Sequence, residues 1–260
     1  ESAETTVQRE IMMAEEETTT MRRIIFSPYE NPTVNDVIRL LLDLTPTEKI
    51  QLTLWFMNRD GFRFSETVEL RELIIQKNSN IHRLEVYDGF DYFVQFLLVN
   101  KGERTHFRYS NCLIKSKLPM QFEQATKLAN AIRSNNNDNG NIESFIFSGC
   151  YDSSEVFQPV WDALLATGVQ DIKLYLEFSE NNDVNGGNVG NKIDVSNIST
   201  NTSLKELQVD ITLCGTNIFD SIKGNTTIEK LILHEASLDN KGKRAFNEML
   251  LENTTLIYVQ

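Results

Sequence analysis

The residue types that most often carry out chemistry are present in this chain, but their spacing does not suit a metal site. Zinc ligands cluster at short spacing, and the histidines and cysteines here do not; they are His82, His106, His234, Cys112, Cys150 and Cys214. His106 and Cys112 are conceivable as a base and a nucleophile. The strand pattern described below instead places His106 on an outward position and Cys112 in a turn. This favours a surface histidine and a small buried thiol.

Two further motifs fail a similar test. Asn181, Asp183, Asn185 and Gly186 can be aligned with a calcium-binding EF-hand loop, but Lys192 then stands where a bidentate glutamate is required. A phosphate-binding GxxxxGK motif does not occur, and "NGGNVGNK" has neither its spacing nor a following helix. We therefore expect no metal and no nucleotide cofactor, and we do not expect an enzyme.

The composition of the 260 residues narrows the possible partners. The net charge of −12 repels nucleic acid, whose affinity for proteins comes largely from lysine and arginine on phosphates. No apolar run approaches the roughly 20 residues that a membrane span needs. Three cysteines, odd in number and sparse, argue against a disulfide framework and favour a reducing compartment. We expect a cytoplasmic or otherwise intracellular protein, with a removed signal peptide and the oligomeric state left open.

A repeated pattern indicates the elements that position these residues. Three apolar residues spaced apolar-x-x-apolar-x-apolar recur, most clearly from Leu204 and Ile228. Nine such starts, of which Lys49 and Arg104 lack the first apolar residue, lie about 29 residues apart on average, 235 residues over eight steps. The pattern predicts parallel strands, paired in chain order, whose register is least certain near Phe107 and Tyr109. The predicted strand segments are 24–26, 52–54, 84–86, 145–147, 172–174, 207–209 and 231–233.

Helix-like stretches with apolar residues three and four apart lie between the strands, so the unit is strand, turn, helix, strand. Asparagine stands three residues before the strand pattern in five of the nine units: Asn78, Asn139, Asn201, Asn225 and Asn253. Because asparagine tolerates the left-handed conformation that ends many helices, we interpret it as a helix stop. The Asn-x-Ser/Thr glycosylation motifs at several of these positions are then a by-product of the fold.

The segment from Leu231 to Asn253, with "LDNKG" followed by "RAFNEMLLEN", resembles the leucine-rich repeats of the ribonuclease-inhibitor type. The resemblance covers residues 21–260 and implies an α/β solenoid, a horseshoe with a parallel concave sheet and convex helices. That family favours asparagine or cysteine three residues after the third apolar position, which Cys112 and Cys150 match, whereas other repeats depart from it. Residues 1–20 are expected to be a tail or a frayed helix, and the Asn/Gly-rich segments 134–141 and 179–192 to be loops.

The same alternation identifies the residues that point away from the core. Aromatic residues and arginine most often contribute the binding energy of protein interfaces. We therefore predict a protein-interaction module, or scaffold, that recognises a protein partner on the concave face. The alternative is a structural or assembly subunit bound through the convex helices or the solenoid ends. The predicted partner-binding residues are Trp55, Tyr87, Arg83, Arg108, His106, Lys173 and Tyr175.

Overall fold

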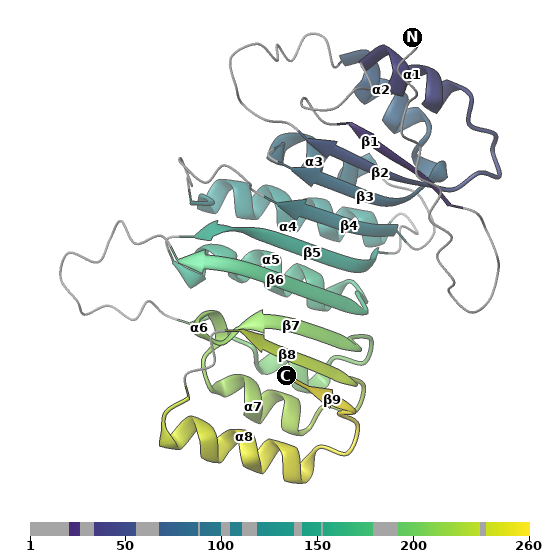
Figure 1. Ribbon diagram of the computed structural model, residues 1–260. Coiled ribbons are helices and arrows are strands. Elements are labelled where there is room, and N and C mark those ends of the chain that lie inside the picture. Colours follow the sequence, from purple (N-terminus) through teal and green to yellow (C-terminus); the bar gives the residue numbers. More distant parts are fainter. Residues whose placement is uncertain are drawn as a thin grey trace, which may run out of the picture. The chain divides into compact units, whose positions relative to one another are not determined.

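The computed structural model shows an α/β fold in which a parallel sheet of nine strands, ordered β1 to β9 as in the chain, alternates with helices (Figure 1). The structure describes residues 21–26, 34–55, 68–87, 89–99, 105–110, 119–137, 142–151, 153–178, 192–234 and 238–260. Residue contacts divide the chain into two compact units. Each unit is described separately below.

Unit 1 comprises Glu1–Leu113 and Asn135–Asn141. Four parallel strands and three α-helices alternate in its described part. Their bounds are β1 (Arg22–Phe26), α1 (Val34–Leu42), β2 (Ile50–Trp55), α2 (Val68–Gln76), the 3-10 turn η2 (Asn78–Asn80), β3 (Ile81–Tyr87), α3 (Phe90–Val99) and β4 (Thr105–Ser110).

Unit 2 comprises Ile114–Ser134 and Ile142–Gln260. It holds most of α4 and all of the later elements of the described chain. Their bounds are α4 (Phe122–Asn137), β5 (Ile142–Tyr151), α5 (Ser154–Ala166), β6 (Asp171–Phe178), the 3-10 turn η4 (Ser196–Thr200), β7 (Glu206–Asp210), α6 (Ile211–Cys214), α7 (Asn217–Lys223), β8 (Lys230–His234), α8 (Asn240–Glu252) and β9 (Tyr258–Val259).

The strand register within each unit is the predicted one. In unit 1 the second apolar residue of each repeat forms one row across the sheet: Ile24, Leu52, Leu84 and Phe107. In unit 2 the corresponding row is Phe145, Ile172, Leu207, Leu231 and Val259. All seven predicted segments lie inside strands. The slip considered near Phe107 does not occur, and the irregularity in unit 1 lies between Ile50 and Gln51 instead.

Alternation along each strand sends the apolar rows toward the helices. In unit 1, Phe93 of α3 contacts Phe107 and Tyr109 of β4, with ring centres 6.2 and 5.3 Å apart. In unit 2, Phe147 of β5 and Phe157 of α5 lie 5.7 Å apart. These five side chains are buried, and burying each stabilises the fold by about 1.5–3 kcal/mol. The opposite face of each strand, here called the outer face, carries polar and aromatic residues.

The prediction that the repeated asparagine adopts a left-handed conformation is wrong. Asn201 and Asn253 have extended backbones, with φ of −70° and −78°. Their side chains instead satisfy main-chain groups left over where a helix or turn gives way to a strand. The Nδ2 of Asn253 donates to the carbonyls of Ile222 and Asn225, and its Oδ1 accepts from the amides of Thr255 and Leu256.

The same arrangement recurs, so we name it the asparagine ladder: Asn80, Asn201, Asn225 and Asn253. In unit 1 the ladder residue is Asn80, which donates to the carbonyls of Thr45 and Glu48. The expected residue, Asn78, has a side chain outside the described residues, as does the whole of Asn139. In the Asn-Thr-Thr motifs the second threonine takes part too. The hydroxyl of Thr255, for example, donates to the carbonyl of Asn225.

Some segments differ from their expected conformations. Helix α4 runs to Asn137, so residues 134–137 are helical rather than part of a loop. Asn135 stabilises this last turn because its Nδ2 donates to the carbonyl of Leu97 at 2.9 Å. The remainder of segment 134–141, residues 179–191 and residues 1–20 lie outside the described residues.

Candidate functional site

Five of the seven predicted binding residues lie on the outer face of unit 1. Strand pairing aligns Gln51 with Arg83 and His106, Thr53 with Glu85 and Arg108, and Trp55 with Tyr87 and Ser110. Arg23 and Ile25 of β1 extend the first two rows. The side chain of Trp55 is outside the described residues, so only its backbone position beside Tyr87 is known. The predicted residues on this face are Trp55, Arg83, Tyr87, His106 and Arg108.

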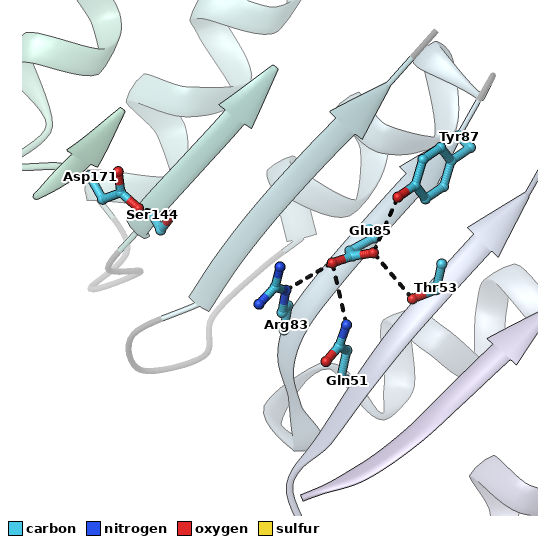
Figure 2. Close-up of polar contacts among 7 residues, drawn as sticks. All are labelled: Gln51, Thr53, Arg83, Glu85, Tyr87, Ser144 and Asp171. Atoms are coloured by element: carbon cyan, nitrogen blue, oxygen red, sulfur yellow. Dashed lines mark hydrogen bonds and ion pairs between the residues drawn. The ribbon is translucent and has the colours of Figure 1, made fainter. Parts of the chain in front are cut away.

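Glu85 organises the centre of this face. Although it points away from the hydrophobic core, it is only 4% exposed. Its Oε1 accepts from Arg83 Nε at 2.9 Å and from Gln51 Nε2 at 3.3 Å. Its Oε2 accepts more weakly from Thr53 Oγ1 at 3.5 Å and from Tyr87 at 3.4 Å (Figure 2). Four donors therefore offset the cost of removing this carboxylate from water.

The two arginines of this face differ in their partners. Arg83 forms an ion pair with Glu85, and its side chain is 32% exposed. The guanidinium carbon of Arg108 lies 5.8 Å from the ring centre of Tyr87, in cation–π range. Arg108 forms neither a hydrogen bond nor an ion pair with the residues that the structure describes, and its Nε is buried. His106 lies edge-on to His82, with ring centres 4.9 Å apart.

The outer face of unit 2 carries a row of alternating positive and negative side chains. Lys173 Nζ lies 3.2 Å from Asp171 Oδ2 and 3.1 Å from Glu206 Oε1. Lys230 Nζ lies 2.9 Å from the same oxygen of Glu206. Ser144 Oγ donates to Asp171 Oδ2 at 2.9 Å; Figure 2 labels this pair. The two lysines and two carboxylates largely neutralise one another.

Burial and ion pairing shift the pKa values of the charged side chains in this row. Burial raises the pKa of the Asp171 carboxyl above its ordinary value, and Lys173 and Ser144 only partly oppose this. Burial also disfavours the charged form of Lys173, but Asp171 and Glu206 outweigh it and raise the pKa of that amine. For Glu206, burial is outweighed by the hydrogen bonds from Lys230 and Lys173, so its pKa is lowered. Asp171 is thus the member whose charge is least well compensated.

Tyr175 is an exposed aromatic residue on the outer face of unit 2, with 40% of its surface accessible. Its ring centre lies 5.5 Å from that of His234. Gln208 Nε2 in turn contacts His234 Nε2. The neighbouring strands therefore support the tyrosine from one side and leave much of it open to a partner.

Of the three cysteines, Cys214 is the one whose side chain the structure describes. Cys214 is buried, and burial raises the pKa of its thiol to about 12, so it stays protonated at neutral pH. Cys112, the side chain of Cys150 and the calcium-like segment before Lys192 are outside the described residues. In the part of the chain that the structure describes, histidine, cysteine and carboxylate side chains do not gather in threes as a metal site requires. None of the helices in that part is long and apolar enough to span a bilayer.

Sequence reasoning found the arginines and aromatics of the outer faces but missed Glu85, the residue that holds two of them. A signal was present, because the predicted register already placed Glu85 beside Thr53 and, two residues from Arg83, on the same face of the strand. Comparison of the chain with models of known protein families and with curated proteins gave no significant match.

Proposed function

We propose that the chain is an α/β solenoid of the leucine-rich-repeat kind whose outer sheet face, the concave face of such solenoids, binds a protein partner. The parallel register in chain order supports the fold part of this proposal. So does the asparagine ladder, which joins successive repeats through equivalent main-chain carbonyls. Stacked repeats of this kind present their strands as one extended binding surface.

The observation that carries the functional part is the network around Glu85. Tyrosine and arginine are the side chains that most often dominate interface energies. Here the carboxylate of Glu85 accepts hydrogen bonds from Arg83 and from Tyr87 on the outer face. Long side chains that are already ordered lose less conformational entropy when a partner binds. The face therefore has the composition and the pre-organisation of a binding surface.

Unit 2 contributes a second region in this proposal. Tyr175 is well exposed and rests against His234. Lys173 is fixed by two carboxylates. A tyrosine supported on one side and open on the other offers a large rigid contact area at a low entropic cost.

The test is a comparison of binding partners captured by three forms of the tagged protein: wild type, Tyr87→Ala and Leu42→Ala. Leu42 is 56% exposed at the end of α1, on the helical side of the same unit. Quantitative mass spectrometry should find a partner that the wild type and the Leu42 variant both retain. The Tyr87 variant should bind it about 30-fold more weakly, since a hot-spot aromatic contributes about 2 kcal/mol. Equal unfolding midpoints would establish that the loss is local.

The opposite pattern, loss with Leu42→Ala and retention with Tyr87→Ala, would contradict this proposal. It would favour the second candidate, an assembly subunit bound through helices or an end of the solenoid. That candidate is supported by Leu251 of α8 and Ile257 beside β9, which are 84% and 82% exposed. Large apolar side chains exposed close together in sequence commonly mark interaction surfaces.

A further inference from the structure

We infer that the outer face of unit 1 selects an acidic segment of its protein partner, a stretch rich in aspartate and glutamate, and that Arg108 is the residue that receives a carboxylate. This inference rests on the proposed function and adds the chemistry of the partner. It follows from three features of the face: its charge, the state of Arg108, and the contrast with unit 2.

The charge of this face is opposite to that of the whole chain. The protein carries a net charge of −12. Among the described residues, the outer rows of β2 to β4 nevertheless present Arg83 and Arg108 against a single carboxylate, that of Glu85. Glu85 is buried and already accepts hydrogen bonds from four side chains. It therefore has little remaining capacity to neutralise a second arginine, and the face stays locally positive.

Arg108 is the donor that the fold leaves unused. Its guanidinium offers five N–H groups, yet within the described part of the protein it donates no hydrogen bond and has no ion-pair partner. Tyr87 holds it from one side by a cation–π contact. A guanidinium with unused donors is best satisfied by a carboxylate, which accepts two parallel hydrogen bonds from it. Because Tyr87 also donates to Glu85, this arginine rests on a ring that is itself fixed.

In unit 2, by contrast, the two lysines of the charged cluster on the outer face are already paired. Lys173 and Lys230 are paired with Asp171 and Glu206 at 2.9–3.2 Å. A carboxylate from outside would have to compete with these pairs for either lysine. At Arg108 no carboxylate of the described residues competes with an incoming one. An acidic segment therefore gains more binding energy at Arg108 than at either lysine.

A polynucleotide is the less favoured occupant, although arginine and tyrosine also suit stacked bases. Its affinity would depend on neutralising many successive phosphates. The described outer face of unit 1 offers few arginines, among them Arg83 and Arg108, and the protein as a whole is acidic. A short peptide with a few carboxylates needs only those cations.

The experiment uses the whole chain and a fluorescent peptide of about eight glutamates, with binding followed by fluorescence anisotropy at low and at physiological salt. Arg108→Gln is the test variant, because among the described residues Arg108 makes no hydrogen bond, and its contact with the chain there is the cation–π contact with Tyr87. Arg39→Gln is the matched control; Arg39 is exposed on α1 of the same unit and loses the same charge. Loss of a charge-assisted hydrogen bond should weaken binding about tenfold in the Arg108 variant only. Added salt should weaken wild-type binding.

Equal weakening by both variants would overturn the inference, since it would mean that net charge alone attracts the peptide. Absence of peptide binding, or tighter binding of an oligothymidylate of similar length, would overturn it as well. These outcomes are separable from failure of the proposed function. If Tyr87→Ala still loses the captured partner while the acidic peptide does not bind, the face binds protein but selects another chemistry. If Tyr87→Ala keeps the partner, both proposals fail.

Discussion

Replacing Asn225 with alanine should destabilise unit 2 more than almost any other change of a polar residue. Asn225 is 2% exposed. Its Nδ2 donates to the carbonyls of Ile198 and Asn201 at 2.8 and 2.9 Å, and its Oδ1 accepts from the amides of Thr227 and Ile228 at 2.8 Å each. Each hydrogen bond contributes about 1 kcal/mol net. The loss in the free energy of unfolding should therefore be about 4 kcal/mol.

The assay is urea unfolding followed by far-ultraviolet circular dichroism, with Asn217→Ala as the matched control. Asn217 is exposed at the start of α7, and its side chain makes no hydrogen bond with a described residue. Its replacement should change the free energy of unfolding by no more than about 0.5 kcal/mol. A loss at Asn225 of about 1 kcal/mol or less would refute the reasoning, because it would mean that water replaces the ladder contacts at almost no cost.

Three further predictions concern pH, reactivity and backbone strain in unit 2. The pKa of Asp171 is raised in the folded protein, so protonation of this carboxyl stabilises the fold. This stabilisation is fully present below the ordinary aspartate pKa of 3.8, and it is lost as the pH rises through the pKa of Asp171 in the folded state. The free energy of unfolding of the wild type, measured in urea, should therefore fall relative to that of Asp171→Asn between acidic and neutral pH; a constant difference would contradict this. Cys214, with a pKa near 12, should escape alkylation by iodoacetamide in the folded protein and react in urea, as peptide mass spectrometry can follow. Gly215→Ala should cost about 1–3 kcal/mol in the same urea assay, because its φ is +67° and a Cβ would lie 2.5 Å from Lys192 Cδ; Gly224→Ala, with open space around it, should cost nothing.

The strands were predictable because one physical rule decides them. A residue that must be buried can appear only at alternate positions of a strand, so apolar spacing fixes both the strand and its register. Even the weakest repeat obeyed this rule, since Phe107 and Tyr109 are both buried against Phe93 of α3.

The interactions of polar side chains were less predictable because their partners are distant in sequence. Asparagine before a strand was interpreted as a local helix stop, but the carbonyls that Asn225 bonds lie 27 and 24 residues earlier. Glu85 likewise depends on Gln51, 34 residues away. The conformational propensity of neighbouring residues does not indicate such distant pairs. They can be predicted only once the strand register is known. An asparagine-rich stretch also predicted a loop at residues 134–137, where Asn135 instead completes a helix by bonding Leu97.

The asparagine ladder has a consequence for how such a chain can change its length. Each ladder residue bonds main-chain carbonyls, which every amino acid supplies, so a repeat does not need a particular side chain in the repeat before it. The spacing can vary as well, since Asn225 lies 24 residues after Asn201 and Asn253 lies 28 residues after Asn225. Duplication of the segment 201–224 within the gene would place a new asparagine against carbonyls of the same kind. The ladder itself would therefore continue through an added repeat, whatever side chains the preceding repeat carries.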